Sequence, residues 1–334
     1  MYQRTLIRHF FLFFTIFSFT TSTQASEYFK NLQSTYSIGP IEGIIIKNSC
    51  SKRAASCEGY CEWVDGRVYT GEFKFGKPSG WGKLTWKDGA FYEGEFKYGT
   101  RHGNGTQTLL NGDRYIGEWN EGYMAGKGDY IWADGTYYNG EFADDKMDGS
   151  GKISLFNGES YYGEWKNGFA DGEGTYLLVD GTKYMGHFKH GKRHGQGVIT
   201  WTTGDVLMGS WVKGQINKES SFKFANGDSY TADWKKGALT NKGIYTVLSD
   251  ERTITGDILT VEHQTISNEA LFESVSPNIG LVLYAIALEF KFNKEFKLAK
   301  HYMLLAQKYV TPSSDINKLI HYQLDIVEEK LEQL

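Results

Sequence analysis

Short stretches in which hydrophobic and polar residues alternate recur along this chain at a fixed interval of 23 residues. In one copy, Tyr115, Gly117 and Trp119 alternate with Ile116 and Glu118, so a strand would place both rings and the glycine on one face. Alternation of this kind predicts a half-buried β-strand. The fixed interval predicts an array of similar units, each in contact mainly with its neighbours.

The spacing within each copy predicts a β-hairpin. We expect residues 120–126 to form the loop that returns the chain, which sets Trp119 opposite Gly128 and Tyr115 opposite Trp132. In this register the glycines lie where the rings need room. Each copy therefore contributes two antiparallel strands.

The array has eight copies, and each begins with a tyrosine or, once, a leucine: Tyr69, Tyr92, Tyr115, Tyr138, Tyr161, Tyr184, Leu207 and Tyr230. Tight turns between copies are predicted at Asp-Gly and Asn-Gly pairs, which tolerate positive φ: Asp65-Gly66, Asp88-Gly89, Asn111-Gly112, Asp134-Gly135, Asn157-Gly158, Asp180-Gly181 and Asn226-Gly227. The predicted fold is mainly β, an elongated single-layer antiparallel sheet of about eight consecutive hairpins, followed by a small helical region.

The recurring residues Y-x-G-E-W/F, followed by G-x-G and D-G, resemble the MORN repeat (membrane occupation and recognition nexus) over residues 57–246. Repeats seven and eight depart from the motif. Lys218 and Ser220 replace the G-x-G pair, and Asn241 replaces one glycine, as expected of terminal repeats. The resemblance implies a repeat array. The family name implies membrane association, and such repeats also occur beside kinase and methyltransferase domains.

The first 25 residues resemble a secretory signal peptide. A basic start is followed by the apolar run FFLFFTIFSF at 10–19 and by small and polar residues that end at Ala25. Ten residues span only about 15 Å as a helix, half of a bilayer core, so a stable transmembrane anchor is disfavoured. We expect cleavage after Ala25 and a secreted or periplasmic protein.

Three cysteines suit an exported chain. Residues 57–66 align with the second strand of a partial repeat, which places Cys50 at the aromatic position of a preceding strand. We expect Cys50 to bridge either Cys57 or Cys61 and to staple the N-terminal edge of the sheet. A bridge between Cys57 and Cys61 is disfavoured, because four strand residues span about 13 Å.

After a predicted capping strand at 254–258, glycine becomes rare and apolar residues recur at helical spacing. Several of these residues, followed by Pro312, are similar in spacing to a single tetratricopeptide helix pair: Leu283, Ile286, Ala287, Phe290, Ala299, Met303 and Ala306. A third helix follows, with Ser314 or Asp315 as its N-cap. These helices either cover the sheet or form a small protein-docking module.

These patterns divide the chain into four predicted parts: a signal peptide at 1–25, an N-terminal segment with a disulfide-capped edge strand at 26–56, the array with its capping strand at 57–261, and a helical region at 262–334. Without the signal peptide, 34 basic and 40 acidic residues leave a formal charge of −6. This charge, without a polybasic run, argues against recognition of anionic lipids.

Two side-chain sets are candidates for chemistry. A row of glutamates recurs once per hairpin, about 10 Å apart, which is too far for a shared ion, so we expect a solvated face with lysine partners: Glu72, Glu95, Glu118, Glu141 and Glu164. His187, His190 and His194 suggest a metal site, but His102 occupies the same repeat position as His194, which favours ordinary loop residues. We expect no metal and no cofactor.

Three functions fit this chain, and the first is favoured: an exported scaffold or adaptor that binds a protein partner, a module for glycans or lipid head groups, or an enzyme. The enzyme is disfavoured because no nucleophile with its base, metal triad or phosphate loop is evident. Nucleic acid is not an expected partner. Aromatic residues dominate the centres of protein interfaces, so the predicted partner-binding residues are Tyr92, Phe96, Tyr115, Trp119, Trp132, Tyr138, Phe142, Tyr161, Trp165 and Tyr184.

Overall fold

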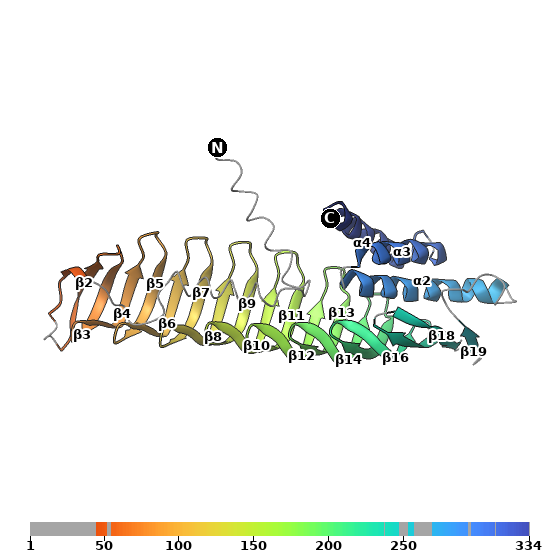
Figure 1. Ribbon diagram of the computed structural model, residues 1–334, viewed down its shortest axis with the longest axis horizontal. Helices are drawn as coiled ribbons and strands as arrows, with labels where there is room; N and C mark the ends of the chain where they lie inside the picture. Colours follow the sequence, from red (N-terminus) through yellow and green to blue (C-terminus); the bar gives the residue numbers. More distant parts are fainter. Residues whose placement is uncertain are drawn as a thin grey trace. The chain divides into compact units, whose positions relative to one another are not determined.

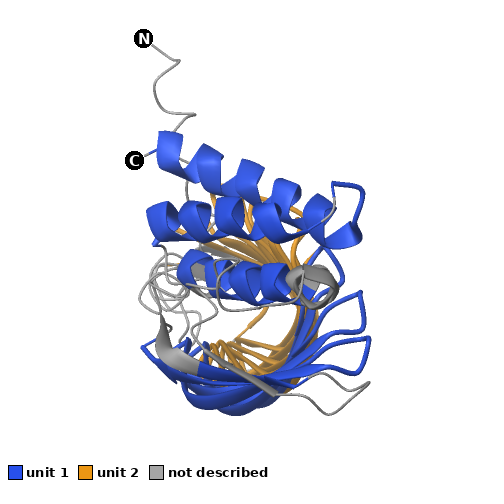
Figure 2. Ribbon diagram, turned by 90° about the vertical axis from the view of Figure 1, so that its right-hand side faces the viewer, with its two compact units in different colours: residues 1–20, 173–334 blue, residues 21–172 orange. Residues whose placement is uncertain are grey.

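The computed structural model describes residues 45–51, 55–236, 238–246, 253–256, 269–292, 295–310 and 312–333 (Figure 1). The chain divides into two compact units, shown in different colours in Figure 2: unit 2 comprises residues 21–172, and unit 1 comprises residues 1–20 and 173–334. The predicted signal peptide lies outside the described residues, as does most of the segment 26–56. Export and the four-part division stay predictions.

Unit 2 is built of antiparallel strands, each paired with the next strand in the chain. The strands are β1 (Ile45–Asn48), β2 (Cys57–Trp63), β3 (Val68–Lys74), β4 (Lys77–Thr85), β5 (Phe91–Lys97), β6 (Thr100–Thr108), β7 (Arg114–Asn120), β8 (Tyr123–Ile131), β9 (Tyr137–Ala143), β10 (Lys146–Ser154) and β11 (Ser160–Lys166), and β12 (Phe169–Leu177) begins in this unit. The predicted succession of hairpins is confirmed.

Unit 1 continues the same pattern and then becomes helical. Its further strands are β13 (Lys183–Lys189), β14 (Lys192–Thr200), β15 (Val206–Val212), β16 (Gln215–Lys223), β17 (Ser229–Lys235), β18 (Ala238–Thr246) and β19 (Thr253–Gly256). The helices are α2 (Glu269–Phe292), α3 (Phe296–Ala306), the short 3-10 helix η1 (Gln307–Tyr309) and α4 (Asp315–Glu332). β19 overlaps the predicted capping strand, whose residues 257–258 lie outside the described part of the chain.

The hairpins turn more tightly than the sequence suggested, so the expected register is wrong. Lys74 pairs with Lys77, and only Phe75 and Gly76 lie between them, both with positive φ, as a two-residue type I′ turn requires. The same short turn in the third hairpin sets Trp119 opposite Met124 rather than opposite Gly128. The seven-residue loop expected from the sequence does not form.

A β-bulge in the returning strand shifts the register by two residues. In β8 the pairing moves from Gly128, opposite Gly117, directly to Ala125, opposite Glu118, so Gly126 and Lys127 have no partner on β7, although both pair with β9. Gly126 has φ +56°, a conformation that favours glycine. The first glycine of each G-x-G pair therefore serves the bulge, which sequence spacing alone did not indicate.

The second glycine of the pair makes room for a tyrosine ring. A Cβ at Gly128 would lie 2.5 Å from Tyr115 Cε2, and a Cβ at Gly117 would lie 2.5 Å from the hydroxyl of the same tyrosine. The ring thus lies across a glycine pair formed by its own strand and the next. The prediction that the glycines are spacers is confirmed, although each ring covers different glycines from those expected.

Hydrogen bonds between backbone groups join each hairpin to the preceding one. The Gly122 amide of one turn donates to the Arg101 carbonyl of the previous hairpin at 2.9 Å, and Gly99 donates to the Pro78 carbonyl at 2.7 Å. At the opposite ends of the strands, the Ala133 amide donates to the Asp113 carboxylate at 2.9 Å. Each of these bonds spans about one repeat, so the contacts that join hairpins in unit 2 are local.

The helices of unit 1 pack in layers over its sheet. Figure 2 shows α2 between the curved strands and α3, with α4 beyond, and α2 contacts both β16 and α3. Residues 279–288 of α2 are buried and almost all apolar, as expected for a helix enclosed on all sides. At the start of α4, Ser314 accepts a hydrogen bond from the Asn317 amide at 3.2 Å, so Ser314 is the N-cap.

A disulfide closes the first edge of the sheet in unit 2. Cys50 is bonded to Cys57, and Cys61 is a buried free thiol, which resolves the two alternatives that the sequence left open. Burial raises the pKa of the Cys61 thiol. A Cβ at Gly59 would contact Ser49 Oγ first and would lie 2.8 Å from Cys50 Sγ, so Ser49 and the cystine together cover this glycine, where a tyrosine ring covers the glycines of later repeats.

Candidate functional site

The predicted partner-binding residues all lie on one face of the strands, which we call the ladder face. Their exposed fractions range from 0 to 6%: Tyr92, Phe96, Tyr115, Trp119, Trp132, Tyr138, Phe142, Tyr161, Trp165 and Tyr184. Nine of these residues belong to unit 2 and Tyr184 belongs to unit 1, and their role in binding a partner stays a prediction. The structure also shows that these rings are buried, so they have little exposed surface that a partner could contact.

The rings of unit 2 form a continuous zigzag of edge-to-face contacts. Tyr115 touches Trp119 of its own strand and Phe142 of the following repeat, with centroid distances of 5.2 and 5.0 Å. The same alternation runs from Phe73 to Trp165, with interplanar angles between 80 and 90°. Such pairs contribute about 0.5–1.5 kcal/mol each beyond their buried area. The rings consequently form a core within a single sheet.

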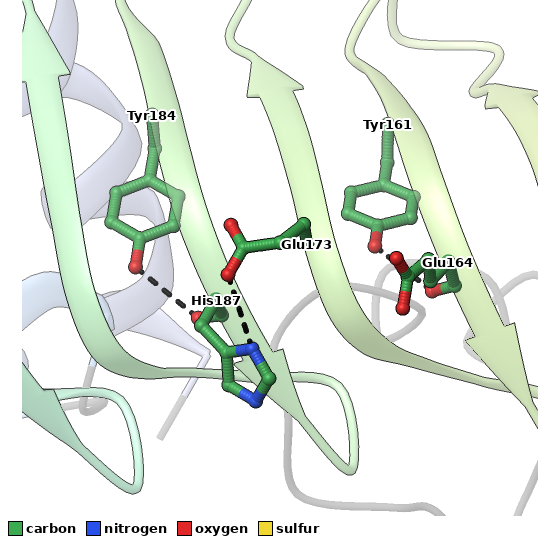
Figure 3. Close-up of polar contacts among 5 residues, drawn as sticks. All are labelled: Tyr161, Glu164, Glu173, Tyr184 and His187. Carbon is green, nitrogen blue, oxygen red and sulfur yellow. Dashed lines mark hydrogen bonds and ion pairs between the residues drawn. The ribbon is translucent and has the colours of Figure 1, made fainter.

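Each tyrosine of this zigzag also satisfies its hydroxyl. Tyr115 donates to the Glu118 carbonyl at 2.9 Å, and Tyr92 donates to the Glu95 carbonyl at the same distance. Figure 3 shows the bond twice more, from Tyr161 to the Glu164 carbonyl at 3.0 Å and from Tyr184 to the carbonyl of residue 187 at 3.3 Å. Burial raises the pKa of the Tyr92 and Tyr115 hydroxyls, so both remain protonated at physiological pH.

The row of glutamates has a structural role that differs from the one expected. Glu118 Oε1 accepts a hydrogen bond from the Lys127 amide, which the bulge leaves without a partner on β7, at 3.0 Å. Glu72 does the same for the Trp81 amide and Glu95 for the Asn104 amide, both at 2.8 Å. Glu72 and Glu118 are exposed and Glu95 is half-buried, so the row faces solvent as expected, but these three carboxylates cap bulges instead of pairing with lysines.

The histidine cluster shows no metal-binding geometry. His187 occupies the position of a bulge-capping glutamate, but its Nδ1 lies 3.3 Å from Glu173 instead (Figure 3). The rings of His187 and His194 are 6.5 Å apart. Among the described residues, no group of three His, Cys, Asp or Glu side chains could hold a metal ion.

Arg101 is a buried residue that sequence reasoning missed. Its guanidinium lies 4.3 Å from the Trp119 ring, donates to Gln107 Oε1 at 2.9 Å and donates to the Gly122 carbonyl at 2.8 Å. Burial lowers its pKa to about 10, and the charge of Asp145 opposes this shift. The sequence did contain a signal that this position is buried, because the equivalent residues in the next two hairpins are methionines.

In unit 1 the ladder face is occupied by the chain's own helix. Asn278 of α2 donates to the Tyr245 hydroxyl at 2.6 Å and lies 3.4 Å from Asp228, which also accepts from Tyr245 at 2.7 Å. Tyr284, also on α2, is fully buried, and burial together with the charge of Asp180 raises its pKa. The helices therefore cover the sheet in this unit, which was one of the two alternatives left by the sequence.

The chain carries six consecutive MORN repeats. Residues 69–91, 92–114, 115–137, 138–160, 161–183 and 184–206 each match the model of the MORN repeat family. The predicted seventh and eighth copies, which begin at Leu207 and Tyr230, form hairpins but lie outside the match. An array of this kind is a repeat scaffold that suggests binding of proteins or lipids rather than catalysis.

Other comparisons add little. No curated protein matches this chain. Among solved structures, the TCP domain of SAS-4 from Drosophila melanogaster, in complex with a proline-rich motif of Ana2, is 12% identical with a TM-score of 0.31, over 56% of this chain and 96% of that chain. The TCP10 domain of Danio rerio CPAP is 12% identical with a TM-score of 0.28, over 53% of this chain and 78% of that chain. Scores this low support no inference.

No helix in the described part of the chain combines the length and the apolar character needed to cross a bilayer.

Proposed function

We propose that this chain is a non-enzymatic scaffold that binds a protein partner on the ladder face of its MORN array. The observation that carries the proposal is the packing of α2 in unit 1. There the ladder face accepts an apolar helix and hydrogen-bonds its polar residue, Asn278, through Tyr245. A face that binds a helix of its own chain has the chemistry needed to bind a segment of another protein.

The ladder face of unit 2 repeats this chemistry at 23-residue intervals. Beside the turns between repeats, this face carries one apolar residue per repeat, which we call the outer row: Trp86, Leu109, Trp132 and Leu155. Trp201 and Phe224 occupy the same repeat position in unit 1. The first three residues of the outer row are 5–9% exposed, and Leu155 is half-buried. Because Leu155 has the most exposed surface of this row, we expect a partner to touch it and to depend on the buried rings only for the shape of the face.

The test uses photo-crosslinking in the full-length chain. A photoreactive amino acid replaces Leu155, which directly follows β10 on the ladder face, or, as a matched control, the exposed Lys152 on the opposite face of β10. We expect a discrete crosslinked protein with the first variant and none with the second. Crosslinking from position 152 alone would assign binding to the other face, and no protein adduct from either position would reject a protein scaffold in favour of glycan or lipid binding.

We further propose that the protein acts after export, in a secreted or periplasmic location. The signal-like residues 1–25 support this, and so does the bridge between Cys50 and Cys57, since disulfides persist in oxidising compartments. Mass spectrometry of the isolated protein should find a chain that starts at Ser26 and contains one disulfide. A chain that retains Met1 and three free thiols would contradict export.

A further inference from the structure

The turn edge of the first two hairpins differs from every later turn. The first turn residue has positive φ in each hairpin, and in the later hairpins it is polar: Glu121, Asp144, Asn167, His190, Lys213 and Lys236. In the first two it is Phe75, with φ +50°, and Tyr98, with φ +53°. Bulky aromatic residues rarely adopt this conformation, and a conformation that costs energy locally is a reason to look for a function.

Both aromatic residues are exposed, and their charged neighbours have one sign. Phe75 is 62% exposed and Tyr98 is 59% exposed, so neither contributes much to a core. The turn segments KFGK (74–77) and KYGT (97–100) contain three exposed lysines and no acid, whereas Glu121 and Asp144 lie at the next two turns. The edge is therefore aromatic and basic over the first two hairpins and acidic over the next two, and the later turns again carry no acid.

The spacing of the two aromatic residues selects the conformation of a ligand. Equivalent residues of consecutive hairpins are two strands apart, which is about 9.6 Å. A polyproline II helix repeats the same side every three residues, about 9.3 Å. Same-side positions of a β-strand recur at about 6.6 Å, and those of an α-helix at about 5.4 and 10.5 Å, so both fit less well.

The small size of this edge also favours a ligand in the polyproline II conformation. Two rings and three lysines cannot offset the ordering of a disordered segment into a helix or strand, whereas proline-rich segments are already extended before they bind. Aromatic side chains are the surfaces on which such segments dock. Lys74, Lys77 and Lys97 add a preference for acidic residues beside the prolines, by charge complementarity.

We propose that Phe75 and Tyr98, with the three adjacent lysines, form a docking edge for a proline-rich, acidic segment of a partner protein. This edge is separate from the ladder face, because it consists of turn residues. The segment contacts one ring per polyproline II turn, and Glu121 ends the site by repelling further acidic residues. The partner thus carries a short motif rather than a folded binding domain.

The experiment uses the full-length chain and an array of proline-rich decapeptides, each with one glutamate placed at a different position. The strongest binders are then measured by fluorescence anisotropy. We expect the double variant Phe75→Asn with Tyr98→Asn to weaken binding about tenfold or more. The melting temperature should not fall, since asparagine tolerates positive φ and the chain itself has Asn167 at this turn position.

The matched control is Glu121→Asn, which changes the same turn position in the third hairpin and should leave peptide binding within about twofold, since surface charges contribute little. Equal binding by the double variant, or no binding by any peptide, would overturn the proposal. Loss in the double variant of binding to liposomes or to neutral oligosaccharides, with no peptide bound, would assign the edge to a membrane or a glycan instead. None of these outcomes depends on the crosslinking test of the ladder face.

Discussion

The third repeat, in unit 2, and the seventh, in unit 1, share a length of 23 residues but are stabilised differently. In the third, Tyr115 lies across a glycine pair and joins an edge-to-face zigzag. In the seventh, Leu207 takes the place of this tyrosine, and the nearby Phe222 stacks at 13° on Trp201 and at 16° on Phe224. The third repeat thus carries edge-to-face rings, whereas the seventh keeps one edge-to-face contact, between Trp211 and Tyr184, and adds stacked rings.

This difference shows what the recurring motif is for. The third repeat makes its core from its own rings, and this uses the tyrosine, both glycines and the bulge cap together. A repeat beside α2 gains burial from the helix, so it can lose the tyrosine at Leu207 and the bulge glycine at Lys218. The departures in repeats seven and eight therefore follow from packing, in addition to their place near the end of the array.

Raising the pH above 10 should have the largest effect, and mainly on unit 2. Burial raises the pKa of Tyr69, Tyr92, Tyr115, Tyr138 and Tyr245, four of which belong to the zigzag. The contribution of these tyrosines to the free energy of unfolding is complete below the unfolded-state pKa of about 10. It is lost as the pH rises further, since only the unfolded chain then loses these protons. At pH 11 each of these tyrosines should lower the free energy of unfolding by about 1.4 kcal/mol.

Arg101 acts in the opposite sense, because its pKa is lowered to about 10 in the folded chain, but one arginine does not offset five tyrosines. Urea unfolding at pH 8 and pH 11 measures the effect. The Tyr115→Phe variant should lose less stability between these two values than the wild type. Equal stability of the wild type at both pH values would contradict the burial of the zigzag.

Trp119→Ala should be the most damaging single substitution in the third repeat. It removes a ring that is 4% exposed and touches both Tyr92 and Tyr115, which should cost about 3–5 kcal/mol of unfolding free energy. Trp119→Phe is the control and should cost about 1 kcal/mol, because Phe142 occupies the same position one repeat later. Chemical denaturation followed by circular dichroism would show both. Similar losses for the two variants would mean that the zigzag requires tryptophan here.

A comparison of Gly117→Ala with Gly209→Ala measures what the tyrosine ring requires. At Gly117 a Cβ would lie 2.5 Å from the Tyr115 hydroxyl and 2.6 Å from the Gly128 backbone, whereas at Gly209 the nearest atom, on Ile216, is 3.1 Å away. We expect a loss of about 2 kcal/mol for the first and less than about 1 kcal/mol for the second. The reverse order in thermal denaturation would show that the glycines do not serve the rings.

The smallest expected effect is a gain in stability for Lys218→Gly. Lys218 has φ +68° where Gly126 stands in the third repeat, so the substitution should relieve about 1 kcal/mol of strain. Lys223→Gly, on the same strand and without positive φ, should instead destabilise by about 0.5–1 kcal/mol. Differential scanning calorimetry would register both shifts. A loss from both variants would place the strain elsewhere.

Much of this fold could be predicted because the repeat signals are local. The alternation around Tyr115, the Asp-Gly turns and the change of composition after residue 258 each reflect a few adjacent residues. The register could not be derived in the same way. It depends on a two-residue turn and on a bulge stabilised by Glu118, whose acceptor role becomes visible only when the Lys127 amide is known to lack a partner on β7.

The candidate site was predictable as a set of residues but not as a surface. Periodicity places the rings on one face, yet it does not reveal that they bury one another. The hydrogen bond from Asn278 to Tyr245 joins residues 33 positions apart, and no local sequence pattern predicts such a contact. Phe75 and Tyr98 share the positive φ of the later turn residues, and what distinguishes them is that they are aromatic and exposed.

The bonds between hairpins have a consequence for how such a chain can change over generations. The Gly122 amide donates to the Arg101 carbonyl and the Ala133 amide to the Asp113 carboxylate, each in the preceding repeat. If a gene loses or duplicates one 23-residue segment, each amide at the new junction therefore still finds an acceptor at the equivalent position of the neighbouring repeat. The loss of residues 115–137 would place Phe142 beside Tyr92, where Trp119 stood. Selection can thus lengthen or shorten this protein by whole hairpins, about 10 Å at a time, without inventing a new contact.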